Sequence, residues 1–271
     1  SNASKAKQAT SRKKLLEKLN VEDLPVSSRK YPFVTFRPER SCGDIILEIK
    51  GLYKKVDGIE VLGGLDLTVN KGDKIAFVGG DSLAKTTLFQ IIAGELQPDA
   101  GEFRWGVTIT SAYYPKENSA WFDNDLNLIE WLCQFPPCDS ESFARGFLGR
   151  MLFSGEEATK KTRVLSGGER VRCMLARMML TGANALVLDE PTNHLDLESI
   201  TALNNGLIDF PEVVLLSSHD HQFVNTVANR IVEFTPAGII DRVMNFEEYL
   251  DNPDITRMRE QFHQGHAELS L

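Results

Sequence analysis

Short apolar runs alternate with segments of helical spacing along most of the chain, a pattern that predicts an α/β fold. Residues 45–49 and 65–69 alternate apolar and polar side chains, as half-buried strands do. The strands expected at 185–188 and 213–217 open with continuous apolar runs, which are typical of a parallel sheet buried on both faces. Further strands are expected at 74–78, 102–105, 108–114 and 231–234, and helices at 86–93, 168–180, 197–207 and 222–227. The alternation predicts a mainly parallel sheet flanked by helices.

One stretch, about residues 117–165, departs from this pattern. Helical spacing recurs at 126–134 and 141–153, and no strand is expected between them. We therefore expect a helical insert inside an α/β body that spans 44–250. The tail at 251–271 is polar, and its spacing is compatible with a helix.

The segment before the body, 1–43, has a different composition. Residues 1–40 hold ten Lys or Arg and four Asp or Glu, a net charge of +6. Because the whole chain has a net charge of −8, residues 41–271 carry a net charge of −14. Residues 4–19 have a helical pattern, and prolines from Pro25 onward indicate an extended connection. The basic charge indicates either an anionic partner or a solvated helix face. We expect Ser1-Asn2-Ala3 to be an expression scar on a piece of a longer protein.

Several classes of protein are disfavoured by the composition. The four cysteines lack paired metal-ligand spacing, which favours reduced thiols of the cytoplasm over a metal site or disulfides. No signal peptide is evident, and no apolar run approaches the ~18 residues that a membrane helix needs.

A Gly-rich turn at 79–87 joins an expected strand to an expected helix and resembles a phosphate-binding loop. In such loops backbone N–H groups surround the phosphates, so Lys85 suits a phosphate cation and Thr86 a hydroxyl ligand of Mg²⁺. Ser82 and Ala84 stand where glycine is usual. If either position needs a left-handed conformation, the strain is about 1–2 kcal/mol. The alternative is an ordinary strand–turn–helix corner.

Two acids follow the buried run at 185–188. Asp189 suits a hold on Mg²⁺ beside Thr86, and Glu190 suits polarisation of an attacking water. His219 follows the next buried run, so it is expected at the same sheet edge, where it could contact a γ-phosphate. The alternatives are a capping pair before Pro191 and a merely structural histidine.

Leu165-Ser166-Gly167-Gly168-Glu169 precedes the helix expected at 168–180. A serine and two glycines at a helix start present free N–H groups and a positive dipole end to an anion. The alternative is an ordinary N-cap, although a plain cap does not require both glycines.

Together these elements resemble the ATP-binding cassette superfamily, and within it the ABC-F branch of soluble twin-cassette ATPases that act on ribosomes. The branch is indicated by the runs at 165–172 (LSGGERVR) and 190–196 (EPTNHLD), because transporter cassettes more often have Gln after the two glycines. The resemblance implies an ABC-type nucleotide-binding fold with an antiparallel β subdomain and a helical insert. It also implies the second, C-terminal cassette of a longer cytoplasmic protein, preceded by the end of the linker between the cassettes.

The resemblance implies roles for matching residues. The Walker A loop would be Gly79, Gly80, Asp81, Ser82, Leu83, Ala84, Lys85, Thr86 and Thr87. Asp189 would bind Mg²⁺ with Thr86, and the catalytic residues would be Glu190 and His219. The signature that touches ATP on the opposite cassette would be Ser166, Gly167, Gly168 and Glu169, with Asp196 in the loop that crosses to the partner. The implied partners are the first cassette, the ribosome and tRNA through the basic linker, and no membrane.

The sequence departs from this family pattern at three places. Ser82 and Ala84 replace glycines, Lys116 stands where a glutamine usually senses Mg²⁺ and γ-phosphate, and Val56 stands where an aromatic usually stacks on adenine. We therefore expect an asymmetric protein in which this half binds or hydrolyses ATP weakly and completes a site on the other half. The alternatives are a nucleotide-binding scaffold without turnover and the ATPase subunit of a membrane transporter.

Overall fold

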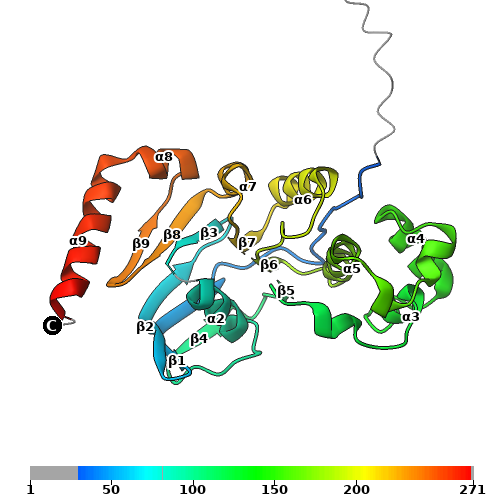
Figure 1. Ribbon diagram of the computed structural model, residues 1–271, viewed down its shortest axis with the longest axis horizontal. Helices are drawn as coiled ribbons and strands as arrows, with labels where there is room; N and C mark the ends of the chain where they lie inside the picture. The colour runs from blue at the N-terminus through cyan, green and yellow to red at the C-terminus, as the bar shows by residue number, and fades with distance from the viewer. Residues whose placement is uncertain (1–29, 81, 270–271) are drawn as a thin grey trace, which may run out of the picture. The chain divides into compact units, whose positions relative to one another are not determined.

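A six-stranded sheet lies at the centre of the protein in the computed structural model, which describes residues 30–80 and 82–269 (Figure 1). Tyr31 onward forms one compact unit. The sheet has the order β5 (Ser111–Tyr114), β6 (Ala185–Asp189), β7 (Val213–Ser217), β3 (Lys74–Gly79), β8 (Arg230–Thr235) and β9 (Gly238–Arg242). All neighbours pair in parallel except β8 and β9. The predicted parallel sheet is therefore confirmed, with one antiparallel edge.

The inner strands β6 and β7 begin with continuous apolar runs because each face of the sheet covers a separate core. In β6, Ala185 and Val187 face a core shared with helix α2 (Ser82–Ile92), whereas Leu186 and Leu188 face the opposite core. The first core also contains a three-stranded antiparallel sheet in the order β2 (Ile59–Val69), β1 (Leu47–Val56), β4 (Ala100–Trp105). The antiparallel β subdomain is therefore present as expected.

Helices cover the second face of the central sheet (Figure 1). They are α5 (Gly167–Leu180), α6 (Leu197–Asp209), α7 (His221–Val227) and α8 (Phe246–Asp251). The last helix, α9 (Pro253–Leu269), packs beside β8 and β9. Neither α8 nor β9 was expected from the sequence pattern.

The expected helical insert contains α3 (Leu128–Leu132), α4 (Glu141–Arg150) and three short 3₁₀ turns, η2 (Ser119–Phe122), η3 (Gly155–Thr159) and η4 (Thr162–Val164). A capping box formed by Asn127 and Glu130 starts α3. Trp131 is buried and stacks on Phe122, with ring centroids 4.9 Å apart. This insert lies beyond α5, at the opposite end of the structure from α9 (Figure 1).

The compact unit begins at Tyr31, ahead of residue 44, where we expected the body to begin. Val34 and Phe36 are buried, and the Phe36 ring packs edge-on against Phe210. The Phe33 N–H donates to the Arg150 carbonyl. The helix expected at 4–19 lies outside the described residues.

Candidate functional site

The phosphate-loop sequence lies between β3 and α2, at the carboxyl edge of the central sheet. Gly79 and Gly80 both have left-handed backbones, with φ of +67° and +54°. A Cβ atom at Gly79 would lie 2.6 Å from Glu233 Cγ and 2.8 Å from the Phe234 carbonyl oxygen. Both the conformation and the space therefore require glycine at this position. Asp81 lies outside the described residues.

The left-handed backbone that would strain Ser82 and Ala84 is not present. Both residues lie in the first turn of α2, and neither has a positive φ. Ala84 is 7% exposed and joins the apolar core beneath the antiparallel sheet. The loop that forms here needs left-handed residues only at Gly79 and Gly80 among those described, so the two replacements cause no backbone strain.

Among the side chains that follow in α2, Thr86 contacts an acid at the end of β6. Lys85 is 5% exposed, and its Nζ donates to the Gly79 carbonyl over 3.1 Å. Thr86 Oγ1 donates to Asp189 Oδ2 over 2.6 Å. Thr87 is buried, and Leu83 is 39% exposed. A hydroxyl and a carboxylate in contact form a donor set that fits Mg²⁺.

Ser217 is a site residue that the sequence analysis missed. It ends β7 in register with Asp189, and its Oγ donates to Asp189 Oδ1 over 2.7 Å. The Glu190 N–H in turn donates to the Ser217 carbonyl and lies 3.2 Å from its Oγ. The register of two adjacent parallel strands could have indicated this contact. Ser217 therefore holds the Asp189 side chain and the Glu190 backbone.

Glu190 and His219 lie in contact, as expected from their positions after adjacent strands. The His219 N–H donates to Glu190 Oε2 over 3.3 Å, and His219 Nε2 lies 3.2 Å from Glu190 Oε1. Glu190 is 3% exposed, whereas the His219 side chain is 74% exposed. Oε1 of Glu190 is buried and accepts no hydrogen bond within the described part of the chain. A buried, unsatisfied carboxylate oxygen beside a histidine is suited to holding a water molecule.

The Ser166 segment forms a complete N-cap for α5. Ser166 Oγ accepts from the Glu169 N–H, and Glu169 Oε2 accepts from the Ser166 N–H over 2.8 Å. Lys160 Nζ donates to the other oxygen of Glu169. Burial raises the pKa of Glu169, but the bonds from Lys160 and Ser166 outweigh it, so the pKa lies below its ordinary value.

Close packing within the chain itself explains both glycines after Ser166. A Cβ atom at Gly168 would lie 3.0 Å from the His194 carbonyl oxygen, and one at Gly167 would lie 3.2 Å from His194 Cβ. The turn at 192–195 is thereby packed against the start of α5. Close packing explains the glycines without an anion, so it weakens our argument that they indicate an anion site.

Asp196 is the N-cap of α6, because its Oδ1 accepts from the Ser199 N–H over 2.8 Å. Its hydrogen bonds with Ser199 lower the pKa of Asp196 despite partial burial. The hydrogen bonds and ion pairs that we observe for Ser166, Glu169 and Asp196 join them to neighbours in their own segments. The structure does not bring these residues to the phosphate loop of the same chain by any such contact among the described residues.

Comparisons with known proteins agree with this geometry. Residues 62–193 match the family model described as ABC transporter. The solved structure of a nucleotide-free ATP-binding cassette from an ABC transporter superposes with a TM-score of 0.59 at 16% identity, covering 78% of this chain and 97% of that one. CbiO1 from Clostridium perfringens, part of an ABC transporter complex, gives 0.58 at 18% identity over 84% of this chain and 100% of its own. The chain has the fold of an ABC-type ATP-binding cassette.

Two curated relatives extend beyond this cassette. The ABC transporter ATP-binding protein YkpA of Bacillus subtilis is 61% identical over 94% of this chain and 48% of its own length. The energy-dependent translational throttle protein EttA of Escherichia coli is 34% identical over 78% of this chain and 39% of its own length. The chain therefore spans about half the length, or less, of the curated relatives that it matches. In the part of the chain that the structure describes, no helix is long and apolar enough to cross a membrane.

A cavity of about 690 Å³ opens beside the phosphate loop of the cassette. It is lined by β2, by the turn between β8 and β9, and by Gly80 and Ala84. Ile59 and Val61 line it, but neither Val56 nor Tyr53 does. The cavity therefore offers apolar side chains of β2, together with Phe234 beside Gly80, and does not include Val56, where the family pattern has an aromatic residue.

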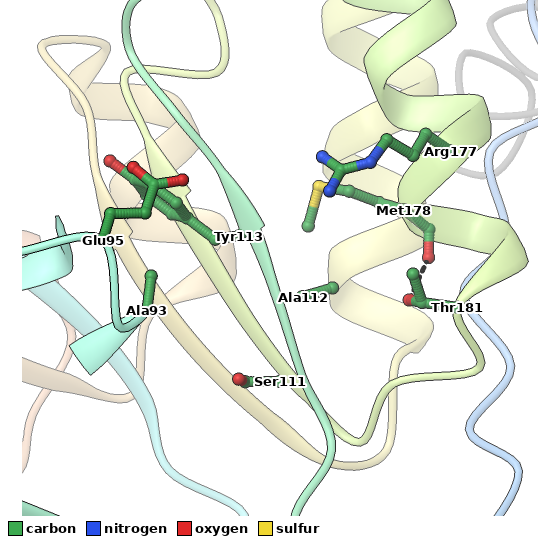
Figure 2. Close-up of a pocket in the computed structure, with 8 residues that line it drawn as sticks. All are labelled: Ala93, Glu95, Ser111, Ala112, Tyr113, Arg177, Met178 and Thr181. Atoms are coloured by element: carbon green, nitrogen blue, oxygen red, sulfur yellow. Dashed lines mark hydrogen bonds between the residues drawn. The ribbon is translucent and has the colours of Figure 1, made fainter. Parts of the chain in front are cut away.

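A smaller pocket, of about 180 Å³, lies between β5 and α5 (Figure 2). Arg177 reaches toward it from α5, and Glu95 and Tyr113 lie across from Arg177 (Figure 2). The Arg177 guanidinium packs 3.9 Å from the Trp121 ring centroid, and burial lowers its pKa. None of the residues predicted for the nucleotide site lines this pocket.

All four cysteines are free thiols, and burial raises the pKa of Cys42 to about 12. Lys116 Nζ donates to Ser82 Oγ over 2.7 Å, so two of the departures from the family pattern touch each other.

Proposed function

We propose that this cassette binds ATP with Mg²⁺ and hydrolyses it as the second half of an ABC-F twin-cassette ATPase that acts on the ribosome during translation. The observation that carries the ATPase part is the convergence of Lys85, Thr86, Asp189, Glu190 and His219 at one sheet edge. A phosphate cation, a metal-binding pair and an acid beside a histidine are what phosphoryl transfer to water requires.

In this proposal the chain's residues act mainly by positioning. The N–H groups of the left-handed Gly79–Gly80 turn and the start of α2 bind phosphate oxygens, and Lys85 adds a charge. Thr86 and Asp189 would hold Mg²⁺, which would supply positive charge to the phosphate oxygens. Glu190 Oε1 orients the attacking water and takes its proton, and His219 holds the water and the γ-phosphate in line.

The second site of the protein would use this chain differently. Ser166 and the start of α5 would close onto ATP held by the first cassette. Asp196 would lie in the loop that crosses to that cassette. Val164 and Leu197, which flank these residues, are each 68% exposed, and such apolar exposure suits burial against another cassette.

Three observations support the ribosomal part of the proposal. They are the sequence motifs LSGGERVR and EPTNHLD, the basic segment at 1–40, and the 34% identity to EttA. The Lys and Arg side chains of this basic segment suit contacts with RNA phosphates. The cassette would then act in the cytoplasm, where ribosomes are.

A scaffold without turnover is the second candidate, and the contact between Lys116 and Ser82 favours it. A cation at this place could oppose Mg²⁺ and slow hydrolysis. The unstrained loop and the intact pairing of Glu190 with His219 oppose this candidate. We retain the expectation of asymmetry between the two cassettes, now on the basis of Lys116 rather than of loop strain.

The first test is Mg-ATP binding to this chain by calorimetry, beside Lys85→Ala. Micromolar binding that the substitution abolishes is expected. Absence of binding, or binding indifferent to Lys85, would leave this half as the supplier of a signature segment only.

Turnover is tested in the twin-cassette protein with Glu190→Gln. Binding should persist while hydrolysis at this site falls at least about 100-fold. Equal losses from Glu190→Gln and from the matching change in the first cassette would contradict asymmetry. Salt-sensitive co-sedimentation of the whole protein with ribosomes separates the ribosomal proposal from a transporter subunit, which would show none.

A further inference from the structure

Lys116 follows β5 and reaches the phosphate loop from a separate part of the chain. Its Nζ donates to Ser82 Oγ over 2.7 Å, and Ser82 is the first residue of α2. Lys85 and Thr86 lie one turn further along the same helix. The start of α2 therefore has two lysines beside it, one from within the helix and one from the segment that leads to the helical insert.

The ammonium group of Lys116 keeps most of its bonding capacity. A lysine has three N–H donors, and Ser82 takes one of those of Lys116. Within the described residues no carboxylate forms an ion pair with Lys116, whereas Lys54 and Lys160 both have acidic partners. Lys116 is half-buried, so water screens its charge less than that of an exposed lysine.

This position is where charge is needed if a triphosphate is bound. In phosphoryl transfer, cations neutralise the negative charge on the phosphate oxygens, and a divalent metal usually carries much of that task. A glutamine, which the family pattern has here, is neutral, but a lysine brings a full charge that does not depend on metal.

We propose that Lys116 is a second phosphate-binding cation, positioned by Ser82, which makes nucleotide binding by this cassette unusually independent of Mg²⁺. The proposal rests on the proposed function, because it assumes that the loop binds ATP. It also accounts for the joint departure at 82 and 116: a glycine at 82 would leave Lys116 without its hydroxyl partner.

The experiment measures the dissociation constant of ATP by calorimetry in excess Mg²⁺ and again in excess EDTA. The variants are Lys116→Gln, Ser82→Gly and Lys85→Ala. Lys50→Gln is the matched control, because it removes one exposed lysine of β1 and so changes the net charge equally.

Lys116→Gln should weaken metal-free binding about tenfold, the loss expected for one charge-assisted hydrogen bond. Binding in Mg²⁺ should weaken less, so the ratio of the two dissociation constants rises. Ser82→Gly should raise the same ratio by a smaller factor, and Lys50→Gln should leave it unchanged.

The two failures are distinguishable. A ratio that is the same in Lys116→Gln as in the unmodified chain, with binding still lost in Lys85→Ala, would overturn the role of Lys116 alone. If the unmodified chain binds no ATP even in Mg²⁺, or if Lys85→Ala binds as well as it does, the proposed function fails and the role of Lys116 fails with it.

Discussion

Arg259 of α9 binds both carboxylate oxygens of Glu233 in β8, with Nε 2.8 Å from Oε1 and Nη2 2.8 Å from Oε2. Tyr249 of α8 donates to the same carboxylate over 2.6 Å. Glu233 is 8% exposed and lies against Gly79, so these three residues connect the end of the chain to the phosphate loop. A polar tail thus contributes to the cassette's interior.

Arg259→Gln should lower the free energy of unfolding by about 2 kcal/mol, because it removes both N–H groups that bond the buried Glu233 carboxylate, together with their positive charge. Arg257→Gln is the matched control on the same helix. Arg257 pairs with Asp254, and both side chains are at least 70% exposed, so this loss should stay below about 0.5 kcal/mol. Urea unfolding of both variants measures the difference, and equal losses would show that the contact with Glu233 does not stabilise the fold.

Gly168→Ala should destabilise the protein by about 1 kcal/mol, although alanine is the better helix former. The added methyl would meet the His194 carbonyl oxygen at 3.0 Å. Gly146→Ala in α4 is the control, because nothing lies within 4 Å of its Cβ position, and it should stabilise the protein by about 0.5–1 kcal/mol. Opposite signs in thermal or urea unfolding are expected. A stabilised Gly168→Ala would contradict close packing at this turn.

Glu169→Gln should reduce stability at neutral pH by about 1 kcal/mol, through the loss of a charged capping partner and of the bond with Lys160. The folded pKa of Glu169 lies below its unfolded value, so its contribution is full above the unfolded pKa and is lost as pH falls through the folded pKa. The difference between the two proteins should therefore shrink as pH falls below about 4.5. Urea unfolding at pH 7 and in acid tests this, and a difference that grows on acidification would contradict it.

Ser217→Ala should slow ATP hydrolysis about tenfold in the twin-cassette protein while leaving ATP binding nearly unchanged, because the Ser217 hydroxyl bonds the Asp189 side chain and the Glu190 N–H and no described residue of the phosphate loop. Ser218→Ala is the neighbouring control. Its hydroxyl contacts Thr192 and the Asp220 N–H, and has no bond to Asp189 or Glu190. Single-turnover hydrolysis separates the two variants. An equal effect of both would indicate general disturbance of the loop after β7.

The sequence predicted secondary structure best where apolar residues recur with a single period along a segment. The strand expected at 213–217 has those bounds, and Glu190, which follows β6, contacts His219, which follows β7, because the carboxyl ends of parallel strands share an edge. The roles proposed for these residues remain predictions. Strands β1 and β2 extend well beyond the expected 45–49 and 65–69, because their register shifts interrupt the alternation that marks a strand.

Other features could not be read from the chain. Strain at Ala84 depended on whether its backbone is left-handed, and only the folded loop shows that the helix already includes that residue. The reason for Gly167 and Gly168 lies some 26 residues away at His194, and proximity of that kind is tertiary. Ser217 was overlooked because a serine at a strand end carries no signal until its neighbour in the sheet is known.

The segment at 31–43 has a mechanical consequence. Its Phe33 N–H is bonded to the Arg150 carbonyl of the helical insert, and its Glu39 N–H to the Gly182 carbonyl beyond α5. The Val34 carbonyl lies so close to Gly206 of α6 that a side chain there would not fit. Tension applied at Lys30 would thus act on the helical insert and on the helices that cover the sheet at the same time, because the segment is attached to both.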